Sequence, residues 1–233
     1  MDALAPLRRR GRERYLNLNP MTFGAGPGKA LEIVCFGAHC DDIEIGCGGT
    51  ILRMAGERRV NVTWVSLSSD PRRAAEARRS AASFLRKASS QRLLIGVFRD
   101  GFLPGQWTEV KTYFERLKDT VAPDLIFTHD RNDRHQDHRI VSELTWNTFR
   151  NHTILEYEIP KYDGELSPPN VYVSVSRAVA ERKAATVLRA YRSQADKQWF
   201  TADTMLGLMR LRGVESNAPG GYAEGFIARK LVI

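Results

Sequence analysis

The chain has 233 residues, 42% of them hydrophobic, and its lysines and arginines outnumber its acidic residues by eight. This length suits one compact α/β domain, and no apolar run approaches the roughly 20 residues that a membrane span needs. The basic start of the chain lacks the apolar stretch of a secretory signal. We therefore expect a cytoplasmic protein without a membrane span, with a basic arm at 1–28 and a single domain at 29–233.

The cysteines argue against a disulfide-rich protein, and the distribution of charge argues against a nucleic-acid-binding protein. Cys35, Cys40 and Cys47 are odd in number and crowded into one short region, so they do not form a disulfide framework. The positive charge favours anionic partners in general. Part of the excess lies in the arginine cluster of the first 28 residues and the remainder is spread along helices, so we expect no nucleic-acid partner.

Apolar runs alternate with helical patterns in the first half of the chain. The runs predict strands covered on both faces, at 31–37, 60–67, 92–98 and 124–128. The helical patterns lie between them, at 48–58, 72–87 and 106–121. This alternation predicts an α/β fold with a Rossmann-like, mainly parallel sheet flanked by helices. The second half is less regular, with strands expected at 154–159, 171–175 and 222–232 and helices at 178–191 and 201–212.

Polar side chains follow two strands of this predicted sheet. His39, Asp41 and Asp42 follow the first strand, and His129 with the segment DRNDRHQDHR follows the fourth. Ligands of open α/β sheets bind beyond the carboxyl ends of the strands, so the two segments are expected to meet at that edge. Imidazole with carboxylate is a usual ligand set for catalytic zinc, and a histidine of the second segment would complete a set with His39 and Asp42.

Such a site predicts a metal-dependent hydrolase. A water bound there would have its pKa lowered toward about 7. Asp41, a neighbouring carboxylate that is not a ligand, is placed to take its proton. A second histidine would stabilise the developing oxyanion and protonate the leaving group. His129 is interpreted as a structural residue that satisfies backbone groups.

The stretch AHCDDIEIGCGGT, at 38–50, resembles the N-terminal motif of the LmbE-like, or PIG-L, family of zinc-dependent N-deacetylases. The family pattern is A-H-P-D-D-E or a close variant, followed by G-C-G-G-T. The segment RHQDHR resembles the second family motif, H-P-D-H, and YAEGF resembles a weaker C-terminal element. The resemblance covers roughly residues 31–150. Cys40 and Gln136 replace prolines of the two motifs, at positions that are not ligands in the family.

The resemblance implies roles for the residues of both motifs. The implied zinc ligands are His39, Asp42 and His138, a donor set that iron(II) or cobalt also suits. Asp41 would be the general base, and His135 would stabilise the oxyanion or act as general acid. Asp137, between the two histidines, would orient one of them. The usual reaction of the family removes acetyl from an N-acetylglucosamine unit and releases acetate and a free amine.

Substrate contacts are expected from loops at the same edge of the sheet. Arg73 follows the second strand and would meet a phosphate or a sugar hydroxyl, since arginine recognises phosphate through its planar fork. Asp100 follows the third strand and would bind a sugar hydroxyl, and Asp133 would face the substrate. We expect an amino-sugar substrate, with a phosphate or nucleotide group as one option. A homo-oligomer is also expected, since related enzymes often assemble as trimers or hexamers.

Two other interpretations compete with a metal-dependent hydrolase. The glycines of EIGCGGT begin too far after the strand for a nucleotide-binding loop. We expect Gly46, Gly48 and Gly49 to let the start of a helix pack close to the metal loop instead. The remaining alternative is a basic nucleic-acid-binding α/β module with a degenerate metal loop, which salt-dependent binding to oligonucleotides would favour.

Overall fold

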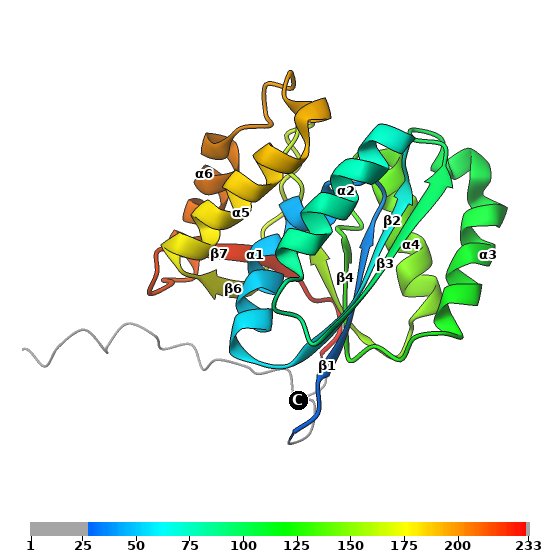
Figure 1. Cartoon of the computed structure of the whole chain (residues 1–233), viewed down its shortest axis with the longest axis horizontal. Coiled ribbons are helices and arrows are strands. Elements are labelled where there is room, and N and C mark those ends of the chain that lie inside the picture. Colours follow the sequence, from blue (N-terminus) through cyan, green and yellow to red (C-terminus); the bar gives the residue numbers. More distant parts are fainter. Residues whose placement is uncertain (1–27, 232–233) are drawn as a thin grey trace, which may run out of the picture.

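The structure is a computed structural model that describes residues 28–231, so the predicted basic arm lies outside the described residues apart from Gly28. The strands are β1 Leu31–Gly37, β2 Val60–Ser68, β3 Ser90–Phe98, β4 Leu125–His129, β5 Thr153–Tyr157, β6 Val171–Val175 and β7 Tyr222–Ile227. They form one sheet in the order β3-β2-β1-β4-β5-β7-β6 (Figure 1). Strands β1 to β5 pair in parallel, and β7 pairs antiparallel with β5 and β6. The predicted Rossmann-like, mainly parallel sheet is confirmed.

Helices cover both faces of this sheet (Figure 1). They are α1 Asp42–Glu57, α2 Pro71–Phe84, α3 Trp107–Lys118, α4 Gln136–Thr148, α5 Arg177–Ala190 and α6 Ala202–Glu215, with short 3-10 turns η1 Leu103–Gln106 and η2 Arg192–Gln194. Alternate residues of β1 point to opposite faces. Ile33 and Cys35 pack with α1, α2 and α5, whereas Val34 and Phe36 pack with α3 and α4. Burial on both faces explains the continuous apolar run of β1.

Both motifs lie at the starts of helices, which the sequence patterns did not predict. The helix predicted from Gly48 already begins at Asp42, whose carboxylate places negative charge in its first turn, where the helix dipole favours it. The second motif enters α4 at Gln136, in a segment where no helix was predicted. In the part of the chain that the structure describes, no helix is long and apolar enough to cross a membrane.

The glycines of the first motif are points of close packing inside α1. A Cβ at Gly46 would lie 2.2 Å from the ring of Tyr157, and one at Gly48 would lie 2.6 Å from the ring of Phe84. These glycines therefore admit side chains from β5 and α2, whereas the sequence suggested that they make room for the metal loop.

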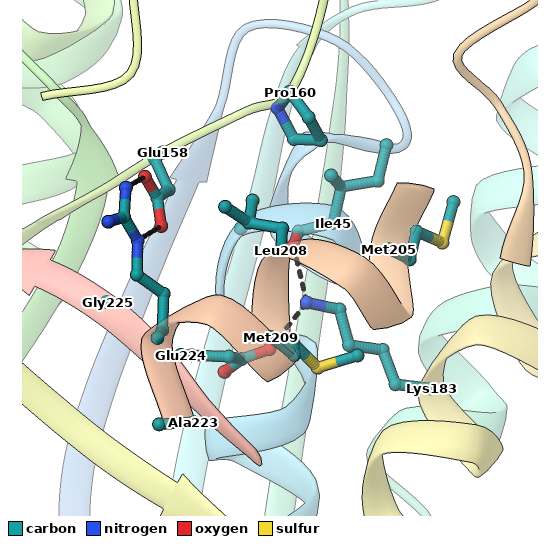
Figure 2. A pocket seen from close by; sticks show the side chains of 12 residues that line it. Ile45, Glu158, Pro160, Lys183, Met205, Leu208, Met209, Ala223, Glu224 and Gly225 are labelled. Carbon is teal, nitrogen blue, oxygen red and sulfur yellow. Dashed lines mark hydrogen bonds and ion pairs between the residues drawn. The ribbon is translucent and has the colours of Figure 1, made fainter. Parts of the chain in front are cut away.

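A buried ion pair holds the C-terminal part of the chain against α1 (Figure 2). Glu224 of β7 accepts hydrogen bonds from the amides of Gly49 and Thr50, at 2.8 and 2.6 Å. Lys183 of α5 pairs with Glu224 at 2.6 Å and donates to the carbonyl oxygen of Ile45 at 2.5 Å. Both charged side chains are almost completely buried. The YAEGF segment thus carries a carboxylate that ties β7 to the helix of the first motif.

Candidate active site

The carboxyl ends of β1 and β4 lie side by side, because these strands pair in register. β1 leads through His39 into α1, and β4 leads through a short loop into α4. The structure therefore brings residues 38–42 and 129–138 together at one edge of the sheet.

Donor atoms of the three predicted metal ligands converge there. His39 Nδ1 lies 3.1 Å from His138 Nε2 and 3.3 Å from Asp42 Oδ2, and His138 Nε2 lies 3.6 Å from Asp42 Oδ1. Tetrahedral zinc with nitrogen and oxygen ligands at about 2.0–2.1 Å places those ligands about 3.3 Å apart. The three separations fit this spacing, and all three residues are buried.

The outward nitrogen of each histidine meets a carboxylate. His138 Nδ1 lies 2.8 Å from Asp133 Oδ2. His39 Nε2 lies 3.3 Å from Asp137 Oδ2 and 3.1 Å from Asp100 Oδ1. A carboxylate accepts from the nitrogen that bears the proton, so the other nitrogen of each ring turns a lone pair into the site. Two facing lone pairs beside the carboxylate of Asp42 repel one another unless positive charge lies between them, so the donors suit a metal ion.

The pKa shifts indicate the same requirement for positive charge. Burial alone would lower the pKa of His39, yet Asp42 and two further carboxylates raise it well above its usual value. Burial alone would raise the pKa of Asp42, yet His138 and its neighbouring histidines hold it well below its usual value. Burial and the nearby His129 lower the pKa of His138 to about 3. Without a metal, a proton on His39 therefore supplies the positive charge that the carboxylates require.

Other groupings of donors share atoms with this set, and they include His129 and His135. His129 is fully buried, and its Nε2 accepts a hydrogen bond from the Ala38 amide at 3.0 Å. Its ring stacks on that of His138 with centroids 3.9 Å apart. Because the Nε2 lone pair is used by the backbone, His129 supports the site and is a poor ligand.

Asp41 lies beside the three donors and lines the pocket above them. Arg73 donates to Asp41 Oδ1 from Nη2 at 2.7 Å and lies 3.6 Å from Asp100. Burial raises the pKa of Asp41, although Arg73 opposes the shift. A raised pKa makes this carboxylate a stronger base than an exposed aspartate, as a general base requires. Arg73, expected to meet a phosphate or a hydroxyl, is thus engaged by Asp41.

His135 is the N-cap of α4, and its Nδ1 accepts a hydrogen bond from the Asp137 amide at 3.2 Å. Burial and the nearby His39 lower the pKa of His135, so the neutral ring carries its proton on Nε2 and can donate to an oxyanion. Asp137 was expected to orient a histidine of its own motif. Its carboxylate contacts His39 instead and accepts hydrogen bonds from the Gly101 and Leu103 amides, at 2.7 and 3.1 Å.

The site opens into a pocket of about 330 Å³, within the range of roughly 300–1,000 Å³ that is typical of small-molecule sites. Arg73 and Asp100 contribute to its wall, and the side chain of Asp100 is 57% exposed. Further lining residues come from the β5–β6 loop and the segment before α6, namely Ile159, Lys161, Tyr162, Asp163, Lys197 and Trp199. None of this second group was predicted as a site residue from the sequence.

Asp133 lies beneath the pocket, whereas the sequence suggested that it faces the substrate. Its Oδ1 accepts a hydrogen bond from the His135 amide at 2.8 Å, and its Oδ2 contacts His138 Nδ1 and Lys161 Nζ. Both oxygens are used within the protein and the residue is buried, so the structure favours a role in orienting His138, and the substrate contact of Asp133 stays a prediction.

Glu44 and Cys40 of the first motif are buried and share Tyr191 as a hydrogen-bond partner. Tyr191 Oη lies 2.5 Å from Glu44 Oε1 and 2.5 Å from the Cys40 carbonyl oxygen. The hydroxyl has one proton and a carbonyl can only accept, so Tyr191 donates to Cys40 and Glu44 donates to Tyr191 as a neutral acid. Burial raises the pKa of Glu44 to about 8 and that of the Cys40 thiol to about 12. Cys40 is therefore a weak nucleophile and a weak ligand.

Several solved structures share this fold. The conserved protein TT1542 from Thermus thermophilus is 24% identical over 87% of this chain and 96% of that chain, with a TM-score of 0.65. The N,N'-diacetylchitobiose deacetylase from Pyrococcus horikoshii is 20% identical over 85% of this chain and 84% of that chain, with a TM-score of 0.62. GalB, the 4-carboxy-2-hydroxymuconate hydratase from Pseudomonas putida, is 14% identical over 87% and 98%, with a TM-score of 0.66.

At these identities the likeness shows the fold alone, and the hydratase shows that the fold supports more than one reaction. The family assignment rests on the sequence. Residues 34–149 match the model of the family described as PIG-L, GlcNAc-PI de-N-acetylase, and this segment contains both motifs and all three converging donors. The chain therefore belongs to the PIG-L, or LmbE-like, family.

Proposed function

We propose that this protein is a zinc-dependent deacetylase that removes the acetyl group from an N-acetylated amino sugar. The observation that carries the proposal is the convergence of His39, Asp42 and His138 donor atoms within 3.6 Å of one another, beside the carboxylate of Asp41. The family match supports the deacetylase reaction, and the donor set supports zinc, with iron(II) or cobalt as metals that suit the same donors.

The residues of the pocket divide the reaction between them. Zinc, when bound, would act as a Lewis acid toward the amide carbonyl and would lower the pKa of a water. Asp41 takes a proton from the attacking water, and Arg73 holds the Asp41 carboxylate at the pocket. His135 donates from Nε2 to the oxyanion that forms as the acetamide carbon becomes tetrahedral. The proton on Asp41 is then available to the leaving amine, so the products are acetate and a free amine.

Asp100 is the residue best placed to select the sugar. Its half-exposed carboxylate lines the pocket beside His39, where it can accept a hydrogen bond from a sugar hydroxyl. The guanidinium of Arg73 donates a hydrogen bond to Asp41. We therefore assign Arg73 the role of holding the base, Asp41, and not that of binding a phosphate of the substrate. A homo-oligomeric state and the absence of a nucleic-acid partner stay predictions.

Metal content is the first test of this proposal. We expect about one zinc per chain in the purified protein by elemental mass spectrometry, because a catalytic site binds one ion through three protein ligands. His138→Ala should remove it. Incubation of the zinc-loaded protein with N-acetylglucosamine and its conjugates should then release acetate. A wild-type protein that takes up no zinc would refute the proposal, and one that binds zinc but releases no acetate would refute the substrate class.

A further inference from the structure

A relay of three side chains connects a proposed metal ligand with the wall of the pocket. Asp133 Oδ2 lies 2.8 Å from His138 Nδ1 and 2.7 Å from Lys161 Nζ. One oxygen of Asp133 thus accepts a hydrogen bond from the imidazole ring of His138 and another from the ammonium group of Lys161. The side chains of His138 and Asp133 are each 3% exposed and that of Lys161 is 11% exposed, so solvent screens these charges poorly.

Lys161 comes from outside the segment that matches the family. It lies in the loop between β5 and β6 and lines the pocket. It also pairs with Glu165 of the same loop, and Glu165 accepts a hydrogen bond from the Arg134 amide at 2.9 Å. Lys161 therefore lies between two carboxylates, of which Asp133 holds a proposed ligand and Glu165 does not.

The position of Lys161 has a consequence for the strength of metal binding. A carboxylate that accepts the N–H of a ligand histidine makes the other nitrogen of the ring more basic, which strengthens its bond to the metal. A cation that contacts the same carboxylate oxygen withdraws negative charge from the carboxylate, so the histidine ring becomes less basic. The positive charge of Lys161 also opposes a metal cation directly, and both effects weaken metal binding.

We propose that Lys161 is a positioning residue that limits the charge donated by Asp133 to His138 and so keeps the bound metal electrophilic. Glu165 opposes this action, because it draws the ammonium of Lys161 away from Asp133. The inference rests on the proposed function, since it requires a metal at His39, Asp42 and His138.

Two substitutions in the loop test the proposal with opposite expected signs. Lys161→Met removes the charge and keeps the length of the side chain, and it should tighten zinc binding about three- to tenfold and lower kcat. Glu165→Gln leaves the charge of Lys161 on Asp133 alone, and it should weaken zinc binding by a similar factor. Changes to the partner of a ligand histidine typically alter metal affinity about 10–100-fold, so effects of this size are measurable.

Zinc affinity is measured by competition with a chromophoric chelator, so the result does not depend on turnover. Lys161→Arg keeps the charge and should keep the wild-type affinity. Arg177→Met breaks an exposed ion pair with Glu181 on α5 and should also change nothing. If Lys161 only fastened the loop, Lys161→Met and Glu165→Gln would each break a loop ion pair and both would weaken zinc binding. That result would overturn the proposal.

The route through Asp133 is tested in an Asp133→Asn background. There, Lys161→Met should tighten zinc binding clearly less than it does with Asp133 present, because the amide has no charge to withdraw and only the direct repulsion between Lys161 and the metal is removed. Equal tightening with and without the Asp133 carboxylate would show that Lys161 acts on the metal directly, and it would refute the relay. A wild-type protein that binds no zinc would instead refute the proposed function, and this inference with it.

Discussion

The neutral state of Glu44 predicts a dependence of stability on pH. Glu44 is fully buried, and because the single proton of the Tyr191 hydroxyl is assigned to the Cys40 carbonyl, Glu44 is assigned as the donor to Tyr191. Burial raises its pKa from 4.5 to about 8. Glu44→Gln preserves the shape of the side chain and cannot ionise, so a comparison of the two proteins isolates the titration of this one carboxyl group.

The sign and size of the effect follow from the two pKa values of Glu44. Below pH 4.5 the group is protonated in the folded and unfolded states, and its stabilising contribution is fully present. As pH rises toward about 8, the unfolded chain releases the proton and the folded protein retains it, so this contribution is lost. The loss is roughly 1.4 kcal/mol for each pH unit, or about 5 kcal/mol over the whole interval.

The assay is urea unfolding of the metal-free protein with a chelator present. The free energy of unfolding of Glu44→Gln should rise relative to that of wild type by about 4 kcal/mol between about pH 5 and about pH 8. Metal-free conditions keep zinc binding out of the comparison. A difference that does not grow with pH would mean that Glu44 is ionised in the folded protein and accepts from Tyr191, which would refute the assignment of the proton.

Three further predictions concern the base and the packing of α1. Asp41→Asn should retain zinc and lose roughly 10²- to 10⁴-fold in acetate release, and loss of zinc would instead make Asp41 a ligand. Gly46→Ala places a Cβ 2.2 Å from the ring of Tyr157 and should lower the free energy of urea unfolding by about 1–3 kcal/mol; an unchanged value would mean that the ring moves aside freely. Lys183→Met leaves the charge of Glu224 buried without its partner and should cost about 3–5 kcal/mol in the same assay. Adding Glu224→Gln should restore part of this loss, and no restoration would show that the charge is not its cause.

The parallel half of the fold could be predicted from the sequence because its strands are buried on both faces. β1 has the bounds that its apolar run predicts, Leu31–Gly37. α4 was missed for a physical reason. Its first turn consists of the polar motif residues Gln136–Arg139, and its buried apolar positions Val141 and Leu144 are too few to give a clear helical period. Polar residues of the motif thus occupy the first turn, where apolar residues would otherwise mark the helical period.

The convergence of the proposed metal ligands could be predicted, whereas their carboxylate partners could not. His39 and Asp42 directly follow a strand, so topology places them at the edge of the sheet. Asp137 of α4 contacts His39, and Asp133 of the loop before α4 contacts His138. These pairings depend on the three-dimensional course of the loop and of the first turn of α4, which the order of residues along the chain does not specify.

The converging donors and the proposed base, Asp41, lie within the family match, at 34–149. Two lysines beyond that segment, of which Lys183 is buried and Lys161 is mostly so, lie behind the site without contacting the donors. Lys161 contacts the carboxylate behind His138, and Lys183 contacts the backbone of α1 one turn after Asp42. Substitutions at these lysines can alter metal affinity or the position of α1 while every ligand stays in place.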